Sequence, residues 1–381
     1  MLIQIHILQN YSPSNLNRDD TGAPKDAIFG GFRRGRISSQ CLKRSIRRST
    51  AFTEAFNKDD LLGVRTRRLP FLVQEELVKL GVPQTEVAEI VERVSAIGRE
   101  SGKVSPEEEE TSQPEAEISE KESQVKQLIF IGRNELKPLA EKLLSIYKRE
   151  GAKNWKKLEI KNITKELGFS TPKSVDIAMF GRMTTSGAFE DVYAAVQVAH
   201  ALSTNTLNQE FDYFTAVDDL SDEPGAGMIG DIEFNSSTYY KYINIHWEEL
   251  VENLGGDVSV AARAVLALLN AAVTAQPTGK QNTFAAFNLP DLVTVEVSRL
   301  NLPVSYANAF LKPVRSTHEA TLMENSITQL SEYLSKVNKT YNLDEKRAYI
   351  SLANGDLTAS ERLPSMKDLR HWLEIQLPTE V

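Results

Sequence analysis

The sequence predicts an α+β fold in which a β-sheet domain carries a helical insertion. Residues 2–8 alternate between apolar and polar side chains, which is the period of a strand. Between residues 52 and 182 the apolar residues recur at helical spacing instead. Beyond residue 205, strand-like and helix-like segments are interleaved. A sheet interrupted by one long helical segment accounts for all three observations.

The N-terminal segment contains the first predicted strand and the first predicted helix. Three alternating isoleucines point to one side of strand 2–8, so one of its faces is expected to be buried. Residues 9–37 are rich in Asn, Ser, Gly and Arg and are predicted to form a long loop. A helix is expected from about 39 to 49, because Ser38 or Ser39 can cap its N-terminus.

The insertion is predicted to be helical and to contain one acidic loop. Pro138 is expected to kink or split a helix, because proline lacks the backbone N–H that the helix needs. The stretch 105–122 holds eight Glu, one Lys and two Pro with few apolar residues, so a solvated, mobile loop is predicted. The predicted helices are 70–80, 84–97, 124–149 and 172–180.

The second half of the chain returns to mixed structure. An amphipathic helix is predicted at 189–202, because its apolar residues recur every three or four positions. Residues 211–246 are rich in strand-forming side chains and carry a Gly/Pro tip at 223–230. The remaining predicted elements are a helix at 258–274, strands at 291–298 and 345–352, and a last helix at 364–375.

Length and composition exclude several classes of protein. With 381 residues, 41% of them hydrophobic, the chain can bury a sizeable core. It has neither a long apolar run nor a basic N-terminal segment, so no membrane span and no signal peptide are expected. One cysteine, Cys41, excludes a disulfide framework and a cysteine-based zinc site. A cytoplasmic protein is predicted.

Charge is distributed unevenly, which matters more for an anionic ligand than the net value of −8. The stretch 105–122 alone carries −7, which leaves −1 for the rest of the chain. Residues 25–49 hold eight Lys or Arg and one acid, Asp26. The chain therefore contains one strongly basic segment.

The predicted helix at 39–49 has one basic side. Leu42 and Ile46 fall on the side that would pack on a sheet. The N-terminus of the helix adds free N–H groups and a positive dipole end, which suit a phosphate. The side opposite Leu42 carries an amide and three cations, namely Gln40, Lys43, Arg44 and Arg47.

The segment before this helix adds glycines and arginines. The Gly-Gly pair at 30–31 lets a polymer approach the backbone closely, and Arg34 and Arg36 can make bidentate phosphate contacts. Phe29 and Phe32 could stack on bases or belong to the core. A solvated basic helix beside a glycine turn is the alternative, but the combination favours nucleic-acid binding.

The sequence lacks the usual signatures of an enzyme. Its five histidines are scattered, and it has neither a GxxxxGK[ST] phosphate loop nor a GxSxG elbow. The acid pairs Asp19-Asp20 and Asp218-Asp219 are poor metal sites, because adjacent aspartates usually point apart. We therefore predict no catalysis, no cofactor and no metal site.

Five blocks of sequence carry a resemblance to a known family. They lie in the family's order and span most of the chain: SPSNLNRDD (12–20), KDAIFGGFRRGRISSQCLKRSIR (25–47), DIAMFGRMTTSG (176–187), DYFTAVDDL (212–220) and GKQNTFAAFN (279–288). On these residues the chain resembles the CasC family, the backbone subunits of the type I-E CRISPR Cascade complex. Residues 52–170 and about 60 C-terminal residues match weakly, and 105–122 looks like a local insertion.

This resemblance implies a fold shaped like a right hand. The palm would be a modified RRM-like or ferredoxin-like sheet, the fingers would be the helical insertion, and the thumb would be a β-hairpin. The implied ranges are 1–51 for the first part of the palm, 52–182 for the fingers, 183–204 for a palm helix, 205–235 for the thumb and 236–381 for the second part of the palm.

The resemblance also implies a non-catalytic subunit present in several copies. Copies would stack along one CRISPR RNA (crRNA), and each thumb would displace one base while the bases between remain free to pair with target DNA. The implied partners are crRNA, target DNA by way of the guide, adjacent copies, and the Cascade subunits CasA, CasB, CasD and CasE.

Site residues follow by position in the matching blocks. Met183 would be an apolar wedge beside the displaced base, although the sequence alone favours an ordinary core residue. Thr215, with Phe211, Tyr213 and Phe214, would belong to the thumb or form one face of a sheet. The residues expected to touch RNA phosphates or sugars are Arg18, Lys25, Arg34, Arg36, Ser38, Gln40, Lys43, Arg44 and Arg47. Lysines that could follow target DNA, or simply form a solvated face, are Lys156, Lys157, Lys161 and Lys165.

Two other functions stay open. In the related backbone subunits of type III complexes, an aspartate in the loop after the first strand cuts RNA, so Asp19 or Asp20 could serve a metal-dependent ribonuclease. The interpretation that we favour is that these aspartates pair with Arg18, or with an arginine of a neighbouring copy, and fix the loop. The other alternative is a general single-stranded nucleic-acid binder without a guide.

Overall fold

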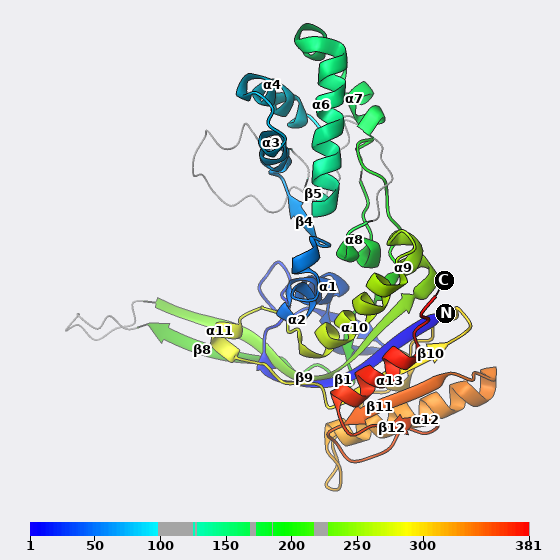
Figure 1. Ribbon diagram of the computed structural model, residues 1–381. Coiled ribbons are helices and arrows are strands. Elements are labelled where there is room, and N and C mark those ends of the chain that lie inside the picture. The colour runs from blue at the N-terminus through cyan, green and yellow to red at the C-terminus, as the bar shows by residue number, and fades with distance from the viewer. Residues whose placement is uncertain (98–124, 126–127, 168–172, 185, 217–227, 381) are drawn as a thin grey trace. The chain divides into compact units, whose positions relative to one another are not determined.

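The structure is a computed structural model that describes residues 1–97, 125, 128–167, 173–184, 186–216 and 228–380 (Figure 1). By its internal contacts the chain divides into two compact units. The sheet unit comprises 1–55, 196–248 and 261–381, and the helical unit comprises 56–195 and 249–260. The assignment of palm, fingers and thumb stays a prediction.

The sheet unit is built on one ten-stranded mixed sheet. Its order is β12-β11-β10-β1-β9-β7-β3-β2, with β6 and β8 also paired to β9. Among the described strands of this sheet, only β11 and β12 pair in parallel. The strands are β1 (Leu2–Ser14), β2 (Asp26–Phe29), β3 (Phe32–Ile37), β6 (Val196–Val198), β7 (Ala201–Ser203), β8 (Glu210–Ala216), β9 (Met228–His246), β10 (Leu292–Ser298), β11 (Lys346–Ser351) and β12 (Glu361–Arg362). The predicted mixed architecture around a large sheet is thus confirmed; an RRM-like palm stays a prediction.

Strand β1 lies inside the sheet and is buried on both faces, not on one face as predicted. β9 and β10 pair with its two edges. Gln4 and His6, which were expected to face water, are 0% and 1% exposed. Helix α12 (Leu322–Tyr341) covers this face, because Leu8 shares one apolar cluster with residues of α12. The pattern was misinterpreted because polar side chains can be buried when they satisfy one another.

The buried polar side chains on this face meet around Glu296 of β10. Arg347 Nε donates to Glu296 Oε1 at 2.5 Å, and Tyr306 Oη donates to Oε2 at 3.1 Å. His6 Nε2 lies 3.6 Å from the same carboxylate. Burial on its own would raise the pKa of Glu296, but His6 and Arg347 together lower this pKa to about 2. The carboxylate is therefore ionised inside the core.

Residues 9–14, 26–29 and 32–37 are strands, so the prediction of one long loop over 9–37 holds only for the segment between β1 and β2. β1 continues to Ser14, and β2 and β3 form a hairpin with the two-residue turn Gly30-Gly31. Both glycines have positive φ, 61° and 82°, as a tight hairpin turn requires. A side chain at Gly30 would also collide with the Leu311 carbonyl oxygen. The charged residues of this hairpin were interpreted as a loop. They are compatible with strands here because the hairpin lies at the edge of the sheet, where charged side chains are common.

The amphipathic helix predicted at 189–202 is wrong as well. The segment contains β6 and β7, both paired with β9. Its apolar residues fit a helical spacing, but Val196 and Val198 are buried on either side of an exposed residue, as in a strand. Backbone partners on β9 outweigh the local pattern, which a single sequence does not reveal.

The helices of the sheet unit are mostly those predicted. The predictions at 39–49, 258–274 and 364–375 are confirmed by α1 (Ser39–Arg48), α10 (Val258–Thr274) and α13 (Met366–Gln376). Helix α12 was missed, although Thr321 and Glu324 form a capping box at its start. The shorter helices are α2 (Thr50–Thr53), α9 (Trp247–Asn253) and α11 (Gln281–Phe284), and α9 and α10 have residues in both units.

The helical unit packs its helices around a core of its own. Helix α6 continues through Pro138 and leaves helical geometry at Gly151, where φ is 73°, so the predicted kink position was wrong. Pro138 is the sixth residue of α6, and the helix continues although the proline removes one helical hydrogen bond. The acidic stretch 105–122 lies outside the described residues. The elements are α3 (Leu69–Lys79), α4 (Gln84–Val94), α6 (Arg133–Trp155), α7 (Ile160–Leu167), α8 (Val175–Phe180), β4 (Gly63–Thr66) and β5 (Ile129–Gly132).

Strand β8 and the first part of β9 extend from the rest of the sheet as a two-stranded ribbon, here called the β8–β9 ribbon (Figure 1). Four of its apolar side chains face water: Phe211, Tyr213, Met228 and Ile229 are 57–66% exposed. Most of the predicted Gly/Pro tip lies outside the described residues. None of the helices in the described residues is long and apolar enough to cross a membrane.

Candidate nucleic-acid interface

Helix α1 separates apolar from charged side chains as the sequence predicted. Leu42 and Ile46 are buried against the sheet unit. On the other side Gln40 and Arg44 are exposed, while Lys43 and Arg47 are half-buried. One surface of α1 therefore displays three cations and an amide.

The first backbone amides of α1 are partly engaged by side chains. Ser38 Oγ caps the helix by accepting a backbone N–H at 3.2 Å. The Ser38 N–H donates to Asn17 Oδ1 at 2.8 Å, and the Ser39 N–H donates to His200 Nδ1 at 3.2 Å. Within the described residues no acceptor is found for the Gln40 N–H. That amide, at the positive end of the helix dipole, is available to an anion.

A groove of about 540 Å³ runs beside α1. Gly279 forms part of its wall, and a Cβ there would lie 2.3 Å from the Leu16 carbonyl oxygen. Only glycine allows this close approach. Three of the sequence blocks on which the resemblance rests, 12–20, 25–47 and 279–288, thus meet at one groove. The lining residues are 16–22, Cys41, Arg44, Ser45, Thr278 and Gly279.

Three of the four predicted cations outside α1, namely Arg18, Lys25 and Arg36, lie in or next to this groove. Arg18 is exposed and lines the groove. Lys25 and Arg36 line a small neighbouring hollow, which shares Asn17 with the groove. The Lys25 N–H donates to the Asn17 carbonyl oxygen at 2.8 Å, and Arg36 Nε donates to the Asp26 carbonyl oxygen at 3.0 Å. The first bond fixes the backbone of Lys25 beside the groove, and the second fixes the guanidinium of Arg36.

Arg34 does not belong to this surface. Its side chain is 0% exposed, and its guanidinium donates to three backbone carbonyl oxygens, those of Ser203, Thr204 and Phe310, at 2.6–2.9 Å. The guanidinium therefore joins the β2–β3 hairpin to two neighbouring segments, and we remove Arg34 from the set of predicted RNA contacts. Its neighbour in sequence, Arg33, is exposed but pairs with Asp26 at 2.6 Å.

Asp19 fixes its own loop. Asp19 Oδ1 accepts from Thr21 Oγ1 at 2.8 Å, from the Thr21 N–H at 3.0 Å and from the Ala23 N–H at 3.0 Å. The bonds from Thr21, and those from the loop backbone, lower the pKa of Asp19. The loop-fixing role was expected, but the partners are Thr21 and backbone amides instead of Arg18. Among the described residues, no three His, Cys, Asp or Glu side chains are grouped as a metal site; Asp218 and Asp219 lie outside them.

Met183 lies in the helical unit and is 94% exposed, so it is not an ordinary core residue. The preceding residue, Arg182, is buried and binds both Glu135 carboxylate oxygens, at 2.7 and 3.1 Å. Arg182 also pairs with Val192 in a β-bridge. The backbone is thereby anchored while the Met183 side chain faces water. Tyr193, next to Val192, is 84% exposed and was not identified from the sequence.

Thr215 lies on the exposed β8–β9 ribbon, opposite Ile229. Successive residues of a strand point to opposite faces, so Phe211, Tyr213 and Thr215 share one face and Phe214 lies on the other. The antiparallel pairing of β8 with β9 is the pairing that the predicted hairpin would have. Its role as a thumb stays a prediction.

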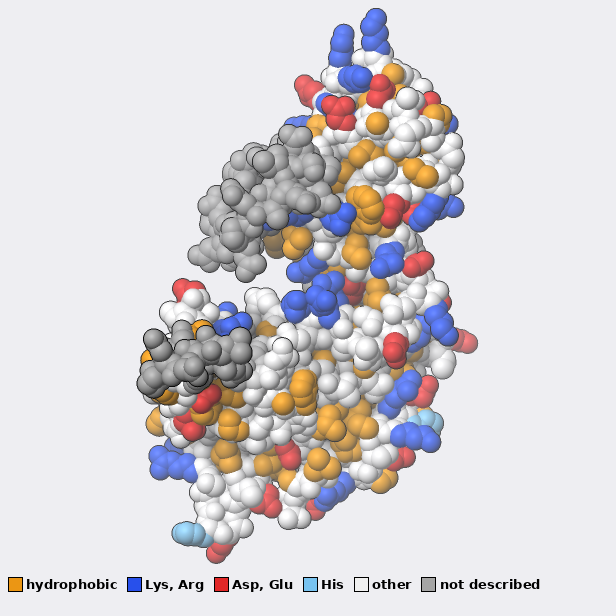
Figure 2. Space-filling view, turned by 90° about the vertical axis from the view of Figure 1, so that its left-hand side faces the viewer, with side chains coloured by type: hydrophobic (Ala, Val, Ile, Leu, Met, Phe, Trp, Pro, Cys, Tyr) orange, Lys and Arg blue, Asp and Glu red, His pale blue; other side chains and the backbone are white. Residues whose placement is uncertain are grey.

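The four lysines expected near DNA lie in the helical unit. All four are exposed, and Lys156 pairs with Glu89 at 3.1 Å. Lys161 and Lys165 are four residues apart on α7 and so share one helical face. Figure 2 shows Lys and Arg side chains projecting from the end of this unit, where Figure 1 places α6 and α7.

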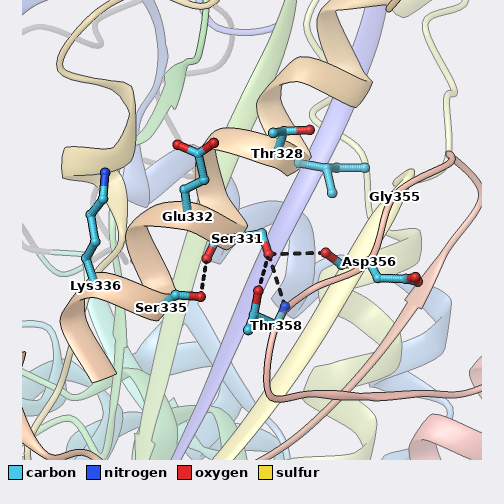
Figure 3. Close-up of a pocket in the computed structure, with 9 residues that line it drawn as sticks. Thr328, Ser331, Glu332, Ser335, Lys336, Gly355, Asp356 and Thr358 are labelled. Carbon is cyan, nitrogen blue, oxygen red and sulfur yellow. Dashed lines mark hydrogen bonds between the residues drawn. The ribbon is translucent and has the colours of Figure 1, made fainter. Parts of the chain in front are cut away.

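A second hollow, of about 390 Å³, lies between α12 and the segment 355–358 (Figure 3). Ser331 stands at its centre, where its Oγ donates to the Asp356 carbonyl oxygen at 3.1 Å and accepts from the Thr358 N–H at 3.0 Å. A further bond of 3.0 Å joins the hydroxyls of Ser331 and Thr358. The central hydroxyls of this hollow, those of Ser331 and Thr358, are thus engaged by the protein itself.

Comparison with known proteins gives the chain its family. No curated protein matches it. One similar solved chain comes from a "CRISPR RNA-guided surveillance complex, pre-nicking", with 29% identity, a TM-score of 0.79, and coverage of 99% of this chain and 100% of that chain. Another comes from a "CRISPR RNA-guided surveillance complex", with 26% identity, a TM-score of 0.61, and 99% coverage of both chains. Since the model of the CT1975-like protein family matches residues 3–373, the chain belongs to this family of Cas proteins.

Proposed function

We propose that this protein is a non-catalytic backbone subunit of a type I-E CRISPR surveillance complex that holds crRNA by its sugar-phosphate backbone. The observation that carries the proposal is the groove beside α1. Arg18 and Arg44 line it, and Lys25 and Arg36 lie next to it. Arginines favour phosphate over other ligands, and so does the Gln40 N–H at the start of α1, for which no acceptor is found in the described residues. The similarity to two chains from CRISPR RNA-guided surveillance complexes supports the same function.

The other exposed features fit the same proposal. The β8–β9 ribbon serves as the thumb, which displaces one base per copy, and Met183 fills the space that the displaced base leaves. The exposed lysines of α7, with Lys157, follow the backbone of target DNA that pairs with the guide. Adjacent copies and the subunits CasA, CasB, CasD and CasE complete a cytoplasmic ribonucleoprotein.

Assembly on RNA is expected to proceed in steps of constant length. Each added protomer should protect the same number of nucleotides from nuclease, because contacts between neighbouring copies set the spacing. Footprints on single-stranded RNAs of increasing length measure this directly. Protected lengths that vary without a step would contradict the proposal and support a general single-stranded nucleic-acid binder.

The same assay tests the ribonuclease alternative. Because Asp19 is engaged by its own loop, added Mg²⁺ or Mn²⁺ is expected to leave the bound RNA intact. Cleavage that requires the metal and disappears in Asp19→Ala would replace the proposed function with the nuclease.

Met183→Ser is expected to separate function from stability. An exposed side chain contributes little to folding, so the free energy of unfolding should change by no more than about 0.5 kcal/mol. A 2-aminopurine base that the complex unstacks should fluoresce less with this variant than with the native chain, because the gap is no longer filled. Met183→Leu is the matched control and should behave like the native protein. Equal fluorescence for all three proteins would remove Met183 from the site.

A further inference from the structure

A β-bulge places His200 at the N-terminus of α1. β6 and β7 both pair with β9, but their registers differ. From Val198 to Leu202 the chain takes four steps, whereas the paired residues on β9, Ile243 and Tyr240, are three steps apart. One extra residue therefore interrupts the ladder, and His200 lies inside this bulge. Bulges redirect side chains, and this one directs His200 to α1.

The imidazole of His200 receives two donors at one nitrogen. The Ser39 N–H donates to His200 Nδ1 at 3.2 Å, and Arg36 Nη1 lies 3.4 Å from the same atom. A backbone amide and a guanidinium can only donate. His200 Nδ1 is therefore an unprotonated acceptor, and the proton of the neutral ring resides on Nε2.

The surroundings keep this ring neutral. Partial burial, followed by the cations of Arg36 and Lys25, lowers the pKa of His200. Protonation would put a second proton on Nδ1, where it would face the Ser39 N–H and the Arg36 guanidinium. His200 itself is exposed, and within the described residues no hydrogen-bond partner is found for Nε2. The chain thus presents one fixed N–H donor among its proposed phosphate contacts.

We infer that His200 is a further RNA-contacting residue, which donates from Nε2–H to a phosphate or ribose oxygen while the N-terminus of α1 holds its tautomer. This inference rests on the proposed function. It adds to that function a neutral contact, which can recognise an oxygen without adding another charge to the basic surface. The sequence held no signal for it, because His200 is far from α1 along the chain and was assigned to a helix.

Two substitutions separate the two nitrogens. Asn places an acceptor near the position of Nδ1 but has no donor at the position of Nε2, whereas Gln can place an amide donor at Nε2 but loses the fixed acceptor at Nδ1. We expect His200→Asn to weaken binding of a single-stranded RNA about fivefold, the effect of one lost hydrogen bond. His200→Gln should bind within about twofold of the native protein. Thermal unfolding of both variants should show that the fold is intact.

The outcomes differ clearly. Native affinity in His200→Asn would overturn the inference, and so would a loss in His200→Gln alone, because His200 would then act only as a structural acceptor for Ser39. Nitrogen NMR of a histidine-labelled sample provides an independent test, since protonation of Nδ1 in the free chain would also overturn it. If the chain binds no RNA at all, the proposed function fails; if it binds RNA but both His200 variants are native-like, only this inference fails.

Discussion

Replacing Lys43, Arg44 and Arg47 together with glutamine is expected to weaken RNA binding about 100-fold at 0.1 M salt. Each neutralised phosphate contributes about 0.7 to the slope of the logarithm of affinity against the logarithm of salt concentration, so three cations contribute about 2. Glutamine keeps the long stem and the helix propensity of the residues it replaces. The folding of α1 should therefore be preserved while its charge is removed. Fluorescence titrations at several salt concentrations measure both the affinity and the slope.

A matched control makes this prediction specific to α1. Arg315, Lys336 and Lys339 are exposed cations of the same unit that lie outside the groove. Their triple glutamine variant has the same net charge as the α1 variant. It should bind RNA with nearly the native salt slope, because these side chains lie away from the proposed strand. An equal loss in both variants would show that only net charge matters and would remove α1 from the site.

Arg347→Met is expected to lower the free energy of unfolding by about 3–5 kcal/mol, because it leaves the buried carboxylate of Glu296 without its arginine. Urea unfolding followed by tryptophan fluorescence measures this loss. The double variant Glu296→Gln with Arg347→Met should be less destabilised than the sum of the single variants, since it leaves no unpaired charge in the core. A loss below about 1 kcal/mol in Arg347→Met would mean that His6 and Tyr306 compensate the carboxylate without the arginine.

The pH dependence of stability provides a check on this pair. The pKa of Glu296 is about 2 in the folded chain and lies near 4.5 when the carboxyl group is exposed. Its stabilising contribution is therefore complete above pH 4.5 and is lost as the pH falls toward 2. Over this interval Glu296→Gln should lose less stability than the native chain. Parallel losses in both proteins would show that other carboxyl groups dominate acid unfolding.

The spacing of apolar residues in the sequence predicted those elements whose tertiary contacts favour the same secondary structure. α10 and α1 carry clear helical periodicity, and Ser38 marks the start of α1, so these helices were found nearly to the residue. The segment 189–202 was misassigned because its partner strand, β9, lies about 40 residues further along the chain. Long-range pairing of this kind has no signature in a short window of sequence. The same limitation hid the second buried face of β1.

The part of the candidate site that could be predicted from the sequence is the part marked by clustered Lys and Arg residues. Helical periodicity alone places the basic residues of α1 on one side, and Arg18, Lys25 and Arg36 lie near that helix in the structure. Arg34 was indistinguishable from Arg36 in sequence, because only the fold shows which guanidinium is surrounded by carbonyl groups. Met183 was uncertain for the opposite reason: an apolar residue gives no sign in sequence that its neighbour, Arg182, is the buried one.

The β8–β9 ribbon bears on whether free copies of the chain associate with one another. Among the described strands β8 pairs only with β9, so its outer edge is open, and open edges with apolar side chains favour self-association. Both faces of this ribbon carry acids: Glu210 and Asp212 on one, Asp231 and Glu233 on the other. When two ribbons approach edge to edge, these like charges repel. These acids therefore oppose edge-to-edge association of free copies, so that the proposed assembly along RNA does not compete with sheet extension through β8.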